Sequence, residues 1–234
     1  MRGLVGKKIG MTRIFNNEGH MVPVTVVQAG PCVVTQLKNK NKDGYEAIQV
    51  GYLDKKLKHL TKPLEGHFNK SGVNPKKILA EFDKVPGFEY KLGQSFHVGI
   101  FKEGDFVRVS GHSKGKGFTG VIKRHNFSRQ KKTHGTGHTE RAPGSIGQAS
   151  DPSRVFPGMR MAGRHGNEKI TIDNLEVMKV SKENNQLLIK GSIPGAKNAE
   201  VVIKKAVKNI RKLTMSEKIE QIEKMKKSAD KKKK

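Results

Sequence analysis

The sequence lacks most features that secreted, disulfide-bonded and membrane-spanning proteins share. It has no tryptophan, three tyrosines and one cysteine, Cys32, so no disulfide can form within the chain. The strand-like residues around Cys32 favour a buried structural thiol over a reactive one. No apolar run reaches the roughly 18 residues of a membrane-spanning helix. The N-terminus shows neither a lipidation motif nor the apolar core of a signal peptide. These absences predict a cytoplasmic protein with no membrane partner.

Acidic residues are also scarce. The 234 residues include 47 lysines and arginines but 21 aspartates and glutamates, which gives a formal net charge of +26. This charge far exceeds what solubility requires, and the self-repulsion opposes a compact state unless a polyanion neutralises it. We therefore expect a nucleic-acid partner. An anionic membrane surface comes second and is disfavoured, since the chain has no long apolar run and no lipidation motif at its N-terminus. The apolar content of 34% predicts a modest core.

No catalytic or metal-binding motif is convincing. The segment GHSKGKGF lacks the spacing of a phosphate-binding P-loop. His134 and His138 are four residues apart, but the two glycines between them oppose a helix and no third ligand is near in sequence. The residues from Gly144 to Gly147 have the wrong spacing for a nucleophile elbow. We expect no enzymatic activity, no metal, no cofactor and no small-molecule substrate.

Most of the chain outside its central 60 residues has the pattern of short β-strands. The alternation of Val22, Val24 and Val26 places them on one face of a strand. Similar runs recur along the chain and are separated by turn signals. The pattern predicts a mainly β fold, with a barrel or sandwich body built from residues 1–110 and 171–207.

Two segments depart from this β pattern. Residues 55–90 contain two prolines and only short helical possibilities, which predicts an insertion or small subdomain. Residues 208–234 form a lysine-rich tail, predicted to be part helical and part disordered. Its helix is indicated by apolar spacing and expected caps, namely Met215, Ile219, Ile222 and Met225 with Thr214 or Ser216 as N-cap. A solvated helix and a contact with RNA or a partner are equally open for this tail.

The positive charge gathers in two blocks, and the first is the more informative. Residues 111–170 carry twelve lysines and arginines against three acidic residues, together with eleven glycines. The part from Gly144 to Gly166 has neither a strand nor a helix period. A segment this long without regular structure is disordered, functional or ordered by a partner. Its glycines permit close backbone approach, its cations neutralise phosphates and its aromatic rings can stack on bases. We interpret it as an extension that penetrates a folded RNA.

Three stretches resemble the bacterial-type large-subunit ribosomal protein three family, the L-three family. They are GLVGKKIGMTRIF, SGHSKGKGFTGVIKRHNF and HGTGHTERAPGSIGQASDPSRVFPGMRMAGRHG, and the resemblance covers about residues 1–205. It implies a β-barrel body of the translation-protein type, with residues 111–170 as a long irregular extension into 23S rRNA. It also implies direct rRNA binding early in subunit assembly, with neighbouring large-subunit proteins as further partners. The tip of the extension is implied to approach the peptidyl transferase centre without performing chemistry.

The RNA-binding residues expected from this resemblance and from charge are cations and tip residues. They are Lys7, Lys8, Arg13, Lys114, Lys116, Lys123, Arg124, Arg129, Lys131, Lys132, Arg141, Gly144, Ser145, Gln148, Arg154, Arg160 and Arg164. Gln148 occupies a position that is methylated in some family members, so a glutamine methyltransferase is a further implied partner. An unmodified glutamine that packs against RNA is equally open. The tail at 208–234 lies outside the family pattern, and no function is carried onto it.

Two rival functions remain from the residues themselves. The first is an RNA-modifying enzyme that grips its substrate with the basic extension, which would need a cofactor loop or an activated nucleophile. The second is a nucleic-acid-binding regulator outside the ribosome, which would not stay with the large subunit through a high-salt gradient. In the ribosomal interpretation, the extension is expected to be mobile until RNA orders it.

Overall fold

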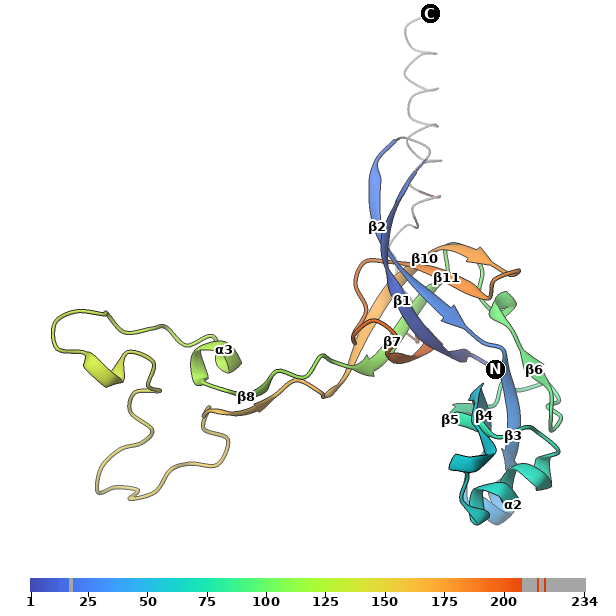
Figure 1. Cartoon of the computed structure of the whole chain (residues 1–234), viewed down its shortest axis with the longest axis horizontal. Coiled ribbons are helices and arrows are strands. Elements are labelled where there is room, and N and C mark those ends of the chain that lie inside the picture. The colour runs from blue at the N-terminus through green and yellow to red at the C-terminus, as the bar shows by residue number, and fades with distance from the viewer. Residues whose placement is uncertain (17–18, 208–213, 215–216, 218–234) are drawn as a thin grey trace, which may run out of the picture. The chain divides into compact units, whose positions relative to one another are not determined.

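The computed structural model describes residues 1–16, 19–207, 214 and 217 (Figure 1). They form two compact units, one containing residues 1–111 and the described residues from 170 onward, the other residues 112–169. Strands are the main elements of the first unit, and six of them form a closed barrel, so the prediction of a mainly β fold with a β-barrel body is confirmed.

Six strands of the first unit form a closed barrel in the order β1-β12-β7-β10-β11-β2. Strands β1 and β2 pair antiparallel and close the ring, and β12 lies on the other side of β1. A bulge between Lys8 and Gly10 shifts the register of β1 against β2. The strand bounds are β1 Gly3–Phe15, β2 Met21–Ala29, β7 Phe106–His112, β10 Lys169–Ser181, β11 Gln186–Lys190 and β12 Glu200–Lys205.

A four-stranded sheet in the order β5-β4-β3-β6 completes the first unit. Its strands are β3 Cys32–Lys38, β4 Ala47–Asp54, β5 Lys76–Asp83 and β6 Ser95–Phe96. Residues 55–90 supply β5, which pairs along β4, so this segment is partly integrated into the sheet. Short helical elements join the strands, namely α1 Lys40–Asp43, η1 Leu57–His59, α2 Lys62–Ser71 and η2 Val98–Ile100.

The barrel and the four-stranded sheet share one apolar core. Leu4 and Ile203 from the barrel and Val34 and Ile48 from the sheet are fully buried in the same cluster. Glycine permits the close approach of β1 and β2, because a Cβ added at Gly6 would lie 2.7 Å from the Gln28 carbonyl oxygen. The modest apolar content is thus concentrated in one place.

Helix α2 shows how sequence signals set an element's ends. Pro63 lies in its first turn, where the missing N–H costs nothing. Gly72 ends it in the left-handed region at φ 64° and donates its N–H to the carbonyls of Asn69 and Phe68. The buried Phe68 ring fixes the helix to the unit. The helix therefore holds its polar side chains at a defined place beside β3.

The predicted C-terminal tail lies outside the described residues apart from Thr214 and Glu217. The backbone N–H of Thr214 donates to Glu217 Oε2 at 2.8 Å, and the backbone N–H of Glu217 donates to Thr214 Oγ1 at 3.2 Å. These reciprocal bonds between Thr214 and Glu217 have the pattern of a capping box. Among the described residues, no helix is long and apolar enough to cross a membrane.

Candidate nucleic-acid interface

The second unit, residues 112–169, begins and ends in a short two-stranded stem. Strand β8 (Gly117–Thr119) pairs antiparallel with β9 (Gly163–His165), coloured green and orange in Figure 1. Nearer the two ends of the unit the pairing continues. The Ser113 N–H donates to the Glu168 carbonyl and the Lys116 N–H donates to the His165 carbonyl, each at 2.9 Å. Backbone hydrogen bonds between the outgoing and the returning strand therefore hold the two ends of this unit together.

Glycine is required where the two arms of the stem meet. Gly166 has φ +75°, a conformation that L side chains rarely adopt. A Cβ added there would overlap the carbonyl oxygen of Lys114 and approach Gly115 Cα to 3.1 Å. The stem keeps this spacing only while position 166 has no side chain.

A short helix, α3 (Val121–His125), fastens the returning arm beyond the stem. Arg124 Nη1 donates to the Met161 carbonyl oxygen at 2.9 Å, and His125 Nε2 donates to the same oxygen at 3.1 Å. The absent side chain of Gly163 leaves room for this guanidinium, because a Cβ there would lie 2.5 Å from Nη1. Arg124, predicted from sequence as an RNA contact, therefore works as a clamp within the protein.

The other predicted cations of this unit face solvent. The structure exposes ten of them, and Arg129 alone among these ten has an ion pair within the described residues, to Glu140 at 3.2 Å. Lys116 Nζ also lies 3.3 Å from His165 Nε2. The ten exposed cations are Lys114, Lys116, Lys123, Arg129, Lys131, Lys132, Arg141, Arg154, Arg160 and Arg164.

The tip is a turn-rich loop with a shallow hollow of about 360 Å³. Gly144 adopts φ +83°, and Ser145 Oγ donates to the Gly147 carbonyl at 2.8 Å. Gln148 lines the hollow and is exposed. The Arg154 guanidinium lies 5.8 Å from the centre of the Phe156 ring, a cation–π geometry. The loop therefore presents an amide, a cation and a ring together.

Exposed rings accompany the charges. Phe118 on β8 is 80% exposed, and Phe156 near the tip is 49% exposed. RNA-binding proteins use exposed rings of this kind to stack on unpaired bases. Rings and cations are thus combined on both arms.

The three cations predicted in the N-terminal motif behave differently from one another. Lys7 is half-buried and Arg13 is exposed on β1. Lys8 is 9% exposed, and its ammonium donates to the carbonyls of Ile193 and Gly195 at 2.8 and 3.0 Å. Because the Lys8 ammonium donates to these carbonyls inside the first unit, we do not include Lys8 in the proposed RNA interface.

Sequence reasoning missed the internal roles of Arg124, His125 and Lys8. The signal for α3 was present, since Gly120 and Asn126 flank five residues and Asn126 ends the helix at φ 59°.

No group of three or more His, Cys, Asp or Glu side chains among the described residues is placed to hold a metal.

A family model described as Ribosomal protein L3 matches residues 88–187. The large ribosomal subunit protein uL3 of Chlorobaculum tepidum is 52% identical over 205 residues, which cover 87% of this chain and 98% of that protein. This chain belongs to the ribosomal protein L3 family. The uL3 proteins of Chlorobium limicola and Corynebacterium jeikeium are 51% and 50% identical, over 87% and 89% of this chain.

Membership of the L3 family confirms the family predicted from the three motifs. L3 proteins are structural proteins of the large ribosomal subunit, which is cytoplasmic, and they are not enzymes. The predictions of a ribosomal, non-enzymatic and cytoplasmic protein are therefore confirmed, and the rival interpretation as an RNA-modifying enzyme is set aside.

Proposed function

We propose that this L3-family chain binds 23S rRNA directly and early in large-subunit assembly, through the extension formed by residues 112–169. Its tip then approaches and helps shape the peptidyl transferase centre, in support of translation. The observation that carries the proposal is the contrast within the extension. The protein's own hydrogen bonds hold the stem, whereas ten cations stay exposed and a single one of them is ion-paired among the described residues.

The chemistry of this interface is binding. Each lysine or arginine that meets a phosphate releases condensed counterions, so affinity falls steeply as salt rises. Cations on both arms, together with glycines that admit close backbone approach, suit the grooves of a folded RNA. Exposed Phe118 and Phe156 suit unpaired bases. RNA shape, rather than base reading, accounts for specificity in this proposal.

Gln148 is the proposed modification site. Its side chain is exposed in the tip loop, where a glutamine methyltransferase can reach it in the free protein. Mass spectrometry of the peptide containing Gln148, from protein made with and without such an enzyme, tests this part. An unmodified peptide under both conditions would leave Gln148 as an RNA-packing residue.

The proposal is tested by rRNA binding across a salt series with the intact chain. In one variant Lys131, Lys132, Arg141 and Arg154 become glutamine. If each contacts a phosphate, the slope of log K against log salt should flatten by about 3, at roughly 0.7–0.9 per contact. A second variant removes four exposed body lysines as a control, namely Lys40, Lys56, Lys179 and Lys182.

Equal slopes for both variants would contradict an anchoring role of the extension. Sedimentation separates the remaining rival. A ribosomal protein should stay with the large subunit through a high-salt gradient, whereas a regulator that acts outside the ribosome should be released. Loss of this chain from the subunit at high salt would count against the proposal.

A further inference from the structure

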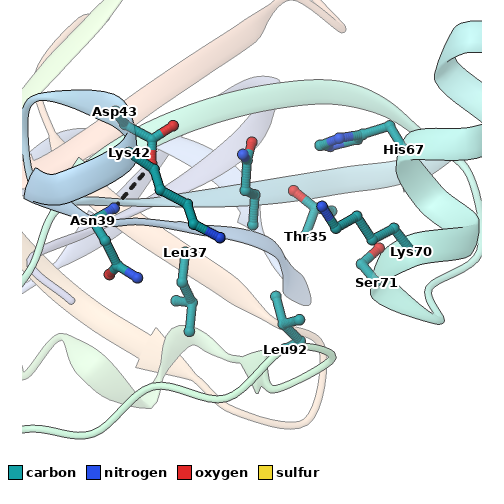
Figure 2. A pocket seen from close by; sticks show the side chains of 10 residues that line it. Thr35, Leu37, Asn39, Lys42, Asp43, His67, Lys70, Ser71 and Leu92 are labelled. Atoms are coloured by element: carbon teal, nitrogen blue, oxygen red, sulfur yellow. Dashed lines mark hydrogen bonds between the residues drawn. The ribbon is translucent and has the colours of Figure 1, made fainter.

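A second basic hollow lies on the four-stranded sheet of the first unit, outside the extension. It has a volume of about 300 Å³ and is formed by β3, α1, α2 and the loop before β6 (Figure 2). The side chains that define it are Thr35, Asn39, Lys42, His67, Lys70 and Leu92. No motif of the sequence singled out this hollow, because its residues are far apart along the chain.

Two lysines give the hollow its charge. Figure 2 shows Lys42 and Lys70 extending toward its centre from opposite sides. Among the described residues neither has an ion-pair partner, whereas Lys38 and Lys76 of the same sheet pair with Glu81 and Asp54. The carboxylate that lines the hollow, Asp43, accepts a hydrogen bond from the Asn39 backbone N–H at 3.0 Å. The two ammonium groups therefore remain available to an anion.

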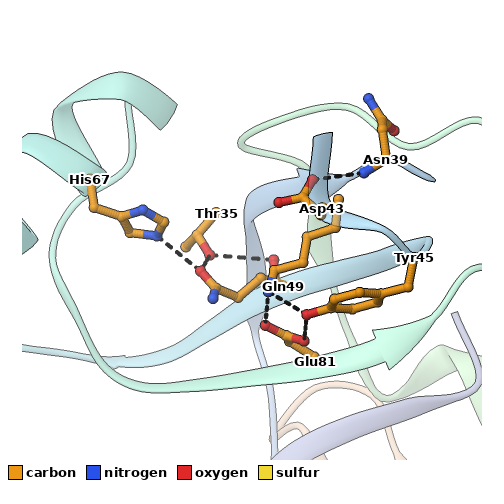
Figure 3. A network of polar contacts seen from close by, with 8 residues as sticks. Thr35, Asn39, Asp43, Tyr45, Gln49, His67 and Glu81 are labelled. Atoms are coloured by element: carbon orange, nitrogen blue, oxygen red, sulfur yellow. Dashed lines mark hydrogen bonds and ion pairs between the residues drawn. The ribbon is translucent and has the colours of Figure 1, made fainter. Parts of the chain in front are cut away.

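Gln49 lies beside the hollow and holds two of the residues that line it. Its Oε1 accepts hydrogen bonds from His67 Nε2 at 2.9 Å and from Thr35 Oγ1 at 3.0 Å (Figure 3). Because a carbonyl oxygen only accepts, the hydroxyl hydrogen of Thr35 is used in this contact. Thr35 is 3% exposed, so its hydroxyl stays within the protein and the contact fixes Gln49 and His67 beside the hollow. The two lysines thus stand in a hollow whose polar side chains are held in place by hydrogen bonds.

An aromatic platform adjoins it. A second hollow of about 270 Å³ shares Leu37 with the first and is lined by Lys84, Phe88 and Tyr90. The Phe88 ring packs on Tyr90 with centroids 4.8 Å apart, yet half of its surface is exposed. Lys84 joins the two hollows by donating to Asn39 Oδ1 at 3.1 Å. A ring supported by the protein on one side is a stacking platform for a base.

We infer that this surface is a second RNA-binding site, in which a phosphate lies between Lys42 and Lys70 and an unpaired base stacks on Phe88. An acidic protein segment would satisfy the lysines but would leave the exposed ring unused. A nucleotide, with its phosphate and its base, matches both the lysines and the ring. The inference rests on the proposed function, because 23S rRNA is taken as the ligand, but it is independent of the extension.

The test uses the full-length chain and 23S rRNA in a salt series. Lys42→Gln with Lys70→Gln should flatten the slope of log K against log salt by about 1.4, at roughly 0.7 for each contact with a single strand. Phe88→Ala should weaken binding by about tenfold and leave the slope unchanged, since stacking releases no counterions. The matched control is Lys179→Gln with Lys182→Gln, which removes the same charge from the barrel.

The inference is wrong if the protein with Lys42→Gln and Lys70→Gln binds rRNA with the same affinity and the same salt slope as the control. If the extension variant still flattens the slope in that case, the proposed function stands alone. If neither variant changes the slope, the proposed function fails as well. A photo-crosslinking residue placed at Leu92, in the assembled subunit, provides a readout that does not depend on affinity. An RNA adduct supports the site, whereas an adduct with protein alone overturns it.

Discussion

Cys32 shows how the environment of a single residue sets its chemistry. Its side chain is fully buried, and Sγ donates to the Val5 carbonyl oxygen at 3.5 Å. Burial raises the pKa of the thiol to about 11, because the thiolate would lose its hydration in the core. Burial also raises the pKa of Tyr52 to about 12. The prediction of a buried structural thiol is confirmed.

The raised pKa of Cys32 predicts a loss of stability at high pH. Above pH 9 the unfolded thiol ionises while the folded thiol keeps its proton, so stability falls as pH rises toward 11. From pH 8 to pH 10 this should lower the unfolding free energy by about 1.3 kcal/mol. Urea unfolding of the wild type and of Cys32→Ala at both pH values measures it. The same pH dependence in both proteins would contradict the prediction.

Gly166 is the residue on which the stem depends. In Gly166→Ala the new Cβ should push the Lys114 carbonyl away and break the pairing of Lys116 with His165. Gly117→Ala is the matched control, because Gly117 also has a positive φ but open space around it. The control should cost about 1–2 kcal/mol of local stability. Hydrogen exchange of the Lys116 amide should accelerate much more in Gly166→Ala, and equal rates would refute the overlap argument.

At the scale of elements, α3 decides how the returning arm is held. In Arg124→Ala the donor to the Met161 carbonyl is lost, so amides of residues 161–165 should exchange faster. Lys123 is exposed on the same helix, and Lys123→Ala should leave this exchange unchanged while it reduces the salt slope of rRNA binding by about 0.9. The two variants thus separate a residue that holds the returning arm from one that contacts a phosphate. If hydrogen exchange is unchanged in Arg124→Ala, Arg124 does not hold the returning arm.

Strand β1 depends on Lys8 for its contact with the loop before β12. In Lys8→Met the carbonyls of Ile193 and Gly195 lose their donor inside the body. The unfolding free energy should drop by about 1–3 kcal/mol. Lys7→Met, at a half-buried neighbour, should change stability less. Chemical denaturation of both variants checks this, and an equal effect would mean that the two carbonyls are satisfied without Lys8.

At the scale of the whole molecule, the single core controls the first unit. Val24 is fully buried, so Val24→Asp places a carboxylate among apolar side chains and should unfold the barrel. Gln28→Asp, at an exposed position of the same strand, is the control. Circular dichroism should show loss of the β signal in the first variant alone. A folded Val24→Asp protein would contradict the role assigned to this core.

Much of this protein follows from its sequence alone. Net charge, the lone cysteine and the short apolar runs are properties of composition, and they predicted a basic β protein with an irregular extension. The three motifs predicted its family, since they are contiguous in the chain. Strand periodicity is equally local, and Val22 and Val24 are buried as the alternation predicted.

The tertiary structure decided what depends on a distant partner. Val26 is partly buried whereas Val27 is fully buried, so the burial pattern of β2 changes where β2 pairs with the bulged part of β1. Lys8 and Arg124 carry the same charge as the exposed cations, but carbonyls far along the chain occupy their donors. The hollow between Lys42 and Lys70 is lined by residues of α1, α2 and β3 that only the fold brings together. Charge is a property of a residue, whereas its availability is a property of what folds against it.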